Sequence, residues 1–248
     1  MKFRLIYGKS GTGKSCYIYE DIKNRMKNNK IFVIVPEQSN LMTEQNLFKY
    51  TQKNTLMNTE VLTLSRMASR IEDELGGKLD TKLSKIGKSM LIYNLLGKYK
   101  SKLQFLGKTP KNVDTVNQLI TEFKKHNITT NEIKSLETEN KYQKLKLQDI
   151  LILYEAYEEK LSNKLIDEND KLNLLAEKLE KSTLLTDAII YIDDFQGFTE
   201  QEFKIIDRIM NKCQELNVVV TLDELNTLTK PENDLFYFNK VFATRLIE

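Results

Sequence analysis

The sequence predicts an α/β fold whose parallel sheet is interrupted by an all-helical insertion. Residues 31–35 and 188–192 are two continuous apolar runs, and both are rich in Ile. Unbroken runs of this kind are typical of strands that are buried on both faces of a parallel sheet. Between them, in residues 66–183, apolar residues recur at spacings of three and four positions, which is typical of amphipathic helices.

Strands and helices alternate on both sides of this insertion. Before it we expect strands and helices in turn, at 3–7, 14–27, 31–35, 41–51 and 61–64. After it we expect a strand, a helix, a strand and a helix, at 188–192, 199–213, 218–222 and 234–248. This alternation predicts a doubly wound sheet. We therefore assign 1–65 and 184–248 to one α/β domain and 66–183 to the insertion.

The composition argues against several classes of protein. No apolar run approaches the roughly 20 residues that cross a bilayer, so we expect a cytoplasmic protein with no membrane contact. His126 is the only histidine, which leaves almost no basis for a Ser-His-Asp centre. Cys16 and Cys213 lack the paired short spacing of a zinc site. The 38 Lys and Arg are balanced by 35 Asp and Glu, and we expect the lysines of the insertion, Lys124 among them, to be solvated.

Residues 8–15 match the P-loop pattern G-x-x-x-x-G-K-[ST] at every fixed position, between an expected strand and an expected helix. The loop consists of Gly8, Lys9, Ser10, Gly11, Thr12, Gly13, Lys14 and Ser15. Its glycines allow backbone N–H groups to converge on a phosphate at the start of the helix. Lys14 is expected to reach the β- and γ-phosphates of ATP and to act in catalysis, and the Ser15 hydroxyl to bind Mg²⁺. The loop predicts a site for a nucleoside triphosphate with magnesium.

A second acidic element would complete such a site. Asp193 follows the apolar run 188–192, so we expect it at the end of a strand, where its carboxylate would bind Mg²⁺. Asp194 stands where hydrolysing P-loop proteins usually carry a glutamate that polarises the attacking water. Its side chain is one methylene shorter, and a misplacement of about 1 Å can cost about a hundredfold in rate. Asp194 is a candidate catalytic residue, and a strand-end turn is the alternative for the pair.

Residues 191–202 resemble motif II of the UvrD/Rep-type DNA helicases, and 165–172 resembles an acidic stretch of the same helicases. A wider set of blocks resembles the N-terminal region of the AddB/RexB-type B subunit of the ATP-dependent helicase–nuclease. These blocks follow the family's order and lie at 8–15, 35–39, 64–68, 86–91, 122–124 and 191–202. The resemblance implies a RecA-like P-loop domain in a fragment of a longer protein, which processes double-strand breaks for recombinational DNA repair.

The same resemblance implies partners, cofactors and DNA contacts. In the family, the B subunit pairs with the motor-bearing A subunit as a heterodimer and acts on duplex DNA ends and single-stranded DNA. Its nuclease domain and iron–sulfur cluster lie toward the C-terminus of the longer protein, outside this chain. The positions implied to contact single-stranded DNA are Pro36, Gln38, Ser39, Thr63, Ser65 and Arg66. The alternative for these residues is an ordinary strand-to-helix turn and cap.

The sequence departs from active helicases in ways that favour nucleotide binding over hydrolysis. By the resemblance, active helicases carry Glu and Asp at the positions of Asp194 and Gly197. Residues 223–226 also lack the Gly-Asp-x-x-Gln coupling motif of these helicases. The chain starts at its first expected strand, so we expect no upstream glutamine segment that reads adenine. We therefore expect a nucleotide-binding and DNA-holding domain. The alternatives are an active DNA-stimulated ATPase or helicase fragment, and a P-loop small-molecule kinase with the insertion as a lid.

Overall fold

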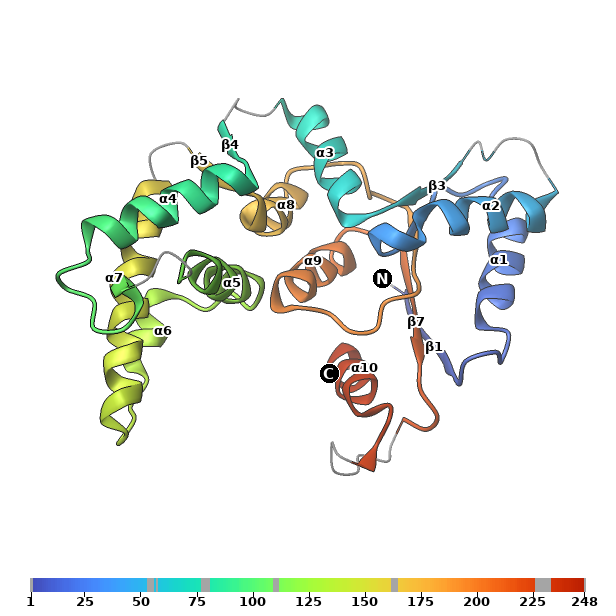
Figure 1. The fold of residues 1–248 in the computed structure, drawn as a ribbon. Helices are drawn as coiled ribbons and strands as arrows, with labels where there is room; N and C mark the ends of the chain where they lie inside the picture. The colour runs from blue at the N-terminus through green and yellow to red at the C-terminus, as the bar shows by residue number, and fades with distance from the viewer. Residues whose placement is uncertain are drawn as a thin grey trace. The chain divides into compact units, whose positions relative to one another are not determined.

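The computed structural model describes residues 2–52, 56, 58–76, 81–108, 112–161, 165–225 and 233–247. The chain forms two compact units, drawn together in Figure 1. Unit 1 comprises Met1–Gly76 and Leu175–Glu248, and unit 2 comprises Gly77–Leu174. Unit 2 is therefore inserted between two segments that together build unit 1.

Unit 1 contains a sheet of five parallel strands. They are β1 (Lys2–Gly8), β2 (Ile31–Ile34), β3 (Thr59–Leu62), β6 (Ile189–Ile192) and β7 (Glu215–Thr221). Their order is β1-β7-β6-β2-β3, so both strands that follow the insertion enter the middle of the sheet. The α/β class and the parallel sheet predicted from the sequence are confirmed. Strand β3 ends earlier than expected, because Thr63 caps the helix that begins at Leu64.

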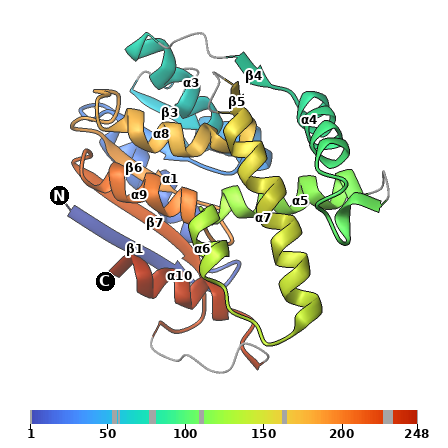
Figure 2. The ribbon, with the colours of Figure 1, turned by 90° about the vertical axis from the view of Figure 1, so that its left-hand side faces the viewer.

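Helices cover both faces of this sheet (Figures 1 and 2). α1 (Lys14–Arg25) and α2 (Asn40–Thr51) lie on one face, and α9 (Glu200–Met210) and α10 (Tyr237–Ile247) lie on the other. α3 (Leu64–Leu75) follows β3, and α8 (Lys171–Leu179) leads back into unit 1. The final helix was expected over 234–248, of which Glu248 lies outside the described residues. The core beneath α1 and α2 contains the fully buried side chains of Ile18, Ile22, Val33, Leu47 and Tyr191.

A network of charged side chains fixes α1 to the sheet. Arg25 of α1 donates hydrogen bonds to both carboxylate oxygens of Glu215, at 2.9 and 2.8 Å. Arg4 of β1 also pairs with Glu215, at 3.0 Å, and donates to Asp21 of α1. The Tyr191 hydroxyl donates to Asp21 at 2.7 Å. Because these groups join α1 to β1, β6 and β7, they hold in place the helix that follows the P-loop.

Unit 2 is mainly helical. Its helices are α4 (Lys85–Lys98), α5 (Asn112–Lys125), α6 (Thr130–Ser135) and α7 (Lys141–Leu161), which enclose an apolar core of their own. Two strands, β4 (Thr81–Leu83) and β5 (Leu165–Asp167), pair in parallel. The insertion was expected to be all-helical, and these strands differ from that expectation because three residues are too few to produce a recognisable strand pattern. No helix in the described part of the chain is both long and apolar enough to cross a membrane.

Two buried lysines lie in the interior of unit 2. Lys124 was expected to be solvated, but it is only 5% exposed and donates to both carboxylate oxygens of Asp170, at 2.7 and 2.8 Å. Lys88 is equally buried and lies 3.3 Å from Asp167 Oδ2. That oxygen also accepts a hydrogen bond from the Tyr157 hydroxyl at 2.6 Å. The expectation for Lys124 was wrong because the sequence alone could not show that its ammonium pairs with Asp170, which lies 46 positions later in the chain.

Candidate functional site

The P-loop forms a tight turn between β1 and α1, in the strand–loop–helix context predicted from the sequence. Gly11 and Gly13 have φ of +78° and +87°, in the left-handed region that glycine adopts without strain. A Cβ on Gly8 would lie 2.8 Å from Thr12 Oγ1, so this glycine permits a close approach within the loop. The Thr12 hydroxyl donates to the Lys9 carbonyl oxygen at 2.8 Å. The backbone conformation of the loop therefore explains why glycine occupies these positions of the motif.

The Lys14 ammonium lies against the curve of the loop. It donates to the carbonyl oxygens of Gly8 and Lys9, each at 2.8 Å. Burial lowers the pKa of Lys14, and the attraction of Asp193 opposes this shift. Gly13, the N-cap of α1, offers no side chain to the helix, and the first turn contains no acidic residue. The N–H groups of this turn and the Lys14 ammonium are therefore suited to an anionic phosphate.

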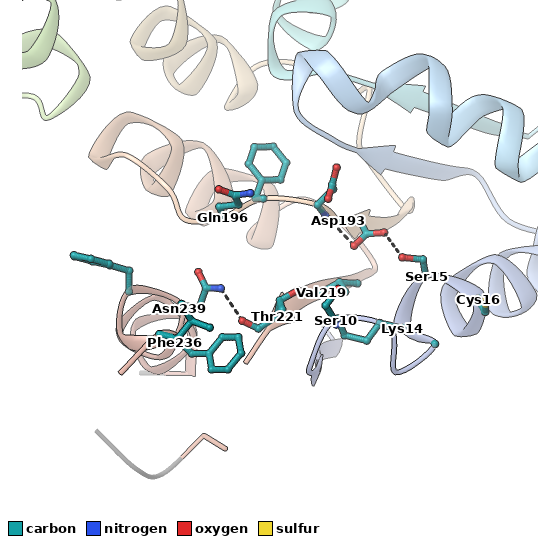
Figure 3. A pocket seen from close by; sticks show the side chains of 16 residues that line it. Ser10, Lys14, Ser15, Cys16, Asp193, Gln196, Val219, Thr221, Phe236 and Asn239 are labelled. Atoms are coloured by element: carbon teal, nitrogen blue, oxygen red, sulfur yellow. Dashed lines mark hydrogen bonds between the residues drawn. The ribbon is translucent and has the colours of Figure 1, made fainter. Parts of the chain in front are cut away.

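The structure brings Ser15 and Asp193 together. The Ser15 hydroxyl donates to Asp193 Oδ2 at 3.4 Å (Figure 3). Asp193 follows β6 and is 8% exposed, and this burial raises its pKa, with a further contribution from the charge of Asp194. A divalent cation beside the carboxylate would oppose both effects. Hydroxyl and carboxylate oxygens are ligands that Mg²⁺ prefers, so these two residues fit the chemistry of the ion.

Asp194 lies beside Asp193 with a left-handed backbone. Its φ is +65°, a conformation that Asp tolerates better than most residues. Its N–H donates to Asp193 Oδ1 at 2.9 Å. Its carboxylate accepts a hydrogen bond from the Ser39 hydroxyl. The structure thus places the candidate catalytic carboxylate beside the P-loop, and joins it to a residue that the sequence grouped with the DNA contacts.

A cavity of about 720 Å³ extends from the P-loop across the ends of the strands, a size suited to a nucleotide-sized ligand. Residues of the P-loop, Asp193 and Asp194 line part of it. Gln196, from the motif II-like block 191–202, also lines it, together with residues that the sequence did not single out, among them Thr221, Phe236 and Asn239 (Figure 3). The Asn239 amide donates to the Thr221 carbonyl oxygen at 2.6 Å. Thr221, Phe236 and Asn239 belong to no local motif, so only the assembled fold shows that they share the cavity.

The candidate DNA contacts lie in the two segments that directly follow the paired strands β2 and β3. Pro36 precedes the 3-10 helix Glu37–Ser39, which contains Gln38 and Ser39. Thr63 is the N-cap of α3, and the first turn of that helix contains Ser65 and Arg66. Gln38 and Arg66 are exposed, and Arg66 pairs with Glu44 at 3.3 Å. Thr63 is 1% exposed, and its hydroxyl accepts a hydrogen bond from the Arg66 N–H at 3.2 Å as the N-cap of α3. The Gln38 and Arg66 side chains are thus accessible to a ligand, whereas the Thr63 hydroxyl is engaged in the cap.

Comparison with known families gives a match over nearly the whole chain. The family model described as "ADDB, N-terminal" covers residues 5–248. The chain belongs to the AddB N-terminal family. The resemblance drawn from the ordered sequence blocks is confirmed by this membership.

Curated relatives of this AddB N-terminal chain are named as the B subunit of an ATP-dependent helicase/deoxyribonuclease. The relative from Clostridium tetani (strain Massachusetts / E88) is 35% identical over 260 residues, which cover 100% of this chain and 23% of the relative. A relative from Clostridium botulinum (strain Hall) is 36% identical over 236 residues, covering 91% and 20%. A relative from Caldanaerobacter subterraneus subsp. tengcongensis is 34% identical over 258 residues, covering 100% and 22%. The chain therefore spans about a fifth of the length of these relatives.

Proposed function

We propose that the chain is the N-terminal ATP-binding domain of the B subunit of a helicase–nuclease, and that it holds nucleotide and DNA rather than driving a motor. The observation that carries this proposal is the hydrogen bond between Ser15 and Asp193 at 3.4 Å, because it puts both oxygens within reach of one Mg²⁺ ion beside the P-loop. Membership of the AddB N-terminal family and the name of the relatives support the wider role.

In this proposal each residue of the site has a separate task. The backbone N–H groups of residues 8–15 bind the phosphates at the start of α1. Lys14 exchanges its carbonyl partners for the β- and γ-phosphate oxygens, which match its charge. Ser15 and Asp193 hold the magnesium ion, which would neutralise the phosphate charge when bound. ATP would occupy the cavity that extends from the loop.

We assign the DNA-holding role to the segments that directly follow β2 and β3. The exposed Gln38 and Arg66 side chains carry hydrogen-bond donors suited to phosphodiester oxygens. Such contacts position a strand and carry little sequence preference. Pro36, Ser39 and Ser65 belong to the same two segments and would shape the path of the strand.

The proposal extends to the longer protein. The relatives are named as a B subunit, which supports assembly with an A subunit as a heterodimer. The complex would act in the cytoplasm on duplex ends and single-stranded DNA, in double-strand break end processing and recombinational repair. The nuclease domain and the iron–sulfur cluster would belong to the part of the B subunit outside this chain, which spans about a fifth of its relatives.

The proposal is tested by ATP turnover and DNA affinity of the 248-residue chain with Mg²⁺. We expect ATP binding, single-stranded DNA binding and negligible turnover whether DNA is present or not. Arg66→Ala should weaken DNA binding, and it should reduce the slope of the logarithm of the binding constant against the logarithm of the salt concentration by about one. The matched control is Arg70→Ala, on the same helix, whose guanidinium pairs with Glu60 at 2.6 Å. DNA-stimulated turnover would instead favour an active helicase fragment, and phosphoryl transfer to a small acceptor without DNA affinity would favour a kinase.

A further inference from the structure

The Asp194 carboxylate is held by a residue from the neighbouring strand end. Ser39 lies in the short 3-10 helix η1 (Glu37–Ser39) after β2, and its hydroxyl donates to Asp194 Oδ2. β2 and β6 are paired neighbours, with Ile34 opposite Ile192. Ser39 is only 9% exposed, so its hydroxyl has little access to water as an alternative partner. The bond therefore links two adjacent strand ends at a largely buried donor.

The backbone of Asp194 restricts the same carboxylate. Its left-handed φ of +65° and the hydrogen bond from its N–H to Asp193 Oδ1 at 2.9 Å fix the direction in which the side chain leaves the main chain. The Ser39 hydroxyl then fixes the orientation of the carboxylate itself. Any reorientation of the Asp194 carboxylate away from Ser39 breaks this hydrogen bond.

We propose that Ser39 is a positioning residue that restrains Asp194 and thereby keeps ATP turnover slow. This inference rests on the proposed function, and it supplies a reason why the domain holds its nucleotide rather than consuming it. Of the described residues that line the cavity, only Asp193 and Asp194 carry carboxylates. Asp193 is engaged with Ser15 and with the Asp194 N–H, which leaves Asp194 as the group available to a water.

The reaction that Ser39 restrains is hydrolysis of the terminal phosphate. The water oxygen forms a bond to the γ-phosphorus, and the bond from that phosphorus to the β,γ-bridging oxygen breaks. ADP leaves with the bonding electron pair, and inorganic phosphate is formed. The proton released by the water passes to the Asp194 carboxylate and from there to solvent.

The first part of the test needs no nucleotide. Unfolding by urea is measured for the unmodified chain, Ser39→Ala, Asp194→Ala and the double variant. We expect the double variant to shift the midpoint by less than the sum of the two single shifts, because either substitution removes the same bond. Ser69→Ala is the matched control, since among the described residues the Ser69 hydroxyl bonds only the Ser65 carbonyl oxygen of its own helix, at 3.2 Å. Its shift should add to that of Asp194→Ala, and additive shifts for Ser39→Ala would overturn the inference.

The second part measures ATP affinity, kcat and KM with Mg²⁺. Ser39→Ala should raise kcat about tenfold, the effect of releasing one hydrogen bond to a charged group, with ATP affinity unchanged. Ser39→Ala with Asp194→Ala should lose this gain, and Ser69→Ala should resemble the unmodified chain. If Asp194→Glu raises kcat and Ser39→Ala does not, the shorter side chain limits turnover and the inference fails. If the unmodified chain binds no ATP, the proposed function itself fails and the inference fails with it.

Discussion

The Ser15 hydroxyl and the Asp193 carboxylate, 178 positions apart in the chain, are joined by a hydrogen bond of 3.4 Å. Ser15 follows the loop after β1 and Asp193 follows β6, and β7 lies between these two strands in the sheet. The contact therefore requires both chain segments of unit 1, one before and one after the insertion. The proposed magnesium site is a product of the assembled sheet rather than of either segment alone.

Replacing Asp193 should separate metal binding from phosphate binding. With Mg²⁺ present, Asp193→Asn should weaken ATP binding by at least about tenfold, because the ion loses a charged ligand. In EDTA the variant should bind ATP no more weakly than the unmodified chain, since the amide removes a charge that repels the phosphates. Isothermal titration calorimetry under both conditions measures this, with the exposed Asp207→Asn as the control. Equal loss of affinity with and without the ion would contradict a metal-binding role.

Alanine at two glycines should have opposite effects on stability. A Cβ on Gly13 or on Gly97 would meet nothing within 4 Å, so only the backbone distinguishes them. Gly13 has φ +87°, and Gly13→Ala should destabilise the chain by about 1–2 kcal/mol. Gly97 lies within α4, and Gly97→Ala should stabilise it by about 0.5–1 kcal/mol. Urea unfolding of the two variants checks the signs, and a stabilising Gly13→Ala would refute the assigned loop conformation.

The local part of the site could be predicted from the sequence, and the long-range part could not. The P-loop is one continuous segment whose glycines and flanking elements produce a pattern, so its strand–loop–helix context was predicted correctly. The bond between Ser39 and Asp194 joins residues 155 positions apart, and no spacing rule reports it. Asn239 reaches the cavity only because α10 packs beside β7. The burial of Lys124 likewise depends on Asp170, which arrives from a distant segment.

The ion network beneath α1 should make stability depend on acidic pH. The hydrogen bonds from Arg25, and then the charges of Arg25, Arg4 and Lys2, lower the pKa of Glu215 from 4.5 to about 2. The folded pKa is depressed, so this stabilisation is fully present above about pH 4.5 and is lost as the pH falls toward 2. Glu215→Gln should therefore be less stable at pH 7, by about 1.5–3 kcal/mol, and the difference should shrink between pH 4.5 and 2. Denaturant unfolding across this range measures it, and a constant difference would be inconsistent with the network.

Removing one partner of the buried Lys88–Asp167 pair in unit 2 should lower the stability of the chain more than removing both. Asp167→Leu leaves the Lys88 ammonium buried without its nearest carboxylate, at a cost of about 3–5 kcal/mol. Lys88→Met combined with Asp167→Leu removes both charges, and the double variant should be more stable than Asp167→Leu alone. Urea unfolding of the unmodified chain, both single variants and the double variant provides a double-mutant cycle for this pair. If the two single costs simply add in the double variant, the side chains do not act as a pair.

The most direct measurement is the affinity of the chain for ATP with Mg²⁺, by isothermal titration calorimetry, for the unmodified chain and for Lys14→Ala. The matched control is Lys23→Ala, on the same helix α1, whose ammonium pairs only loosely with Glu20 at 3.8 Å. If the P-loop binds the phosphates, we expect saturable ATP binding that Lys14→Ala weakens about 10- to 100-fold and that Lys23→Ala leaves intact. Binding that is equal in all three proteins, or absent from the unmodified chain, would contradict it.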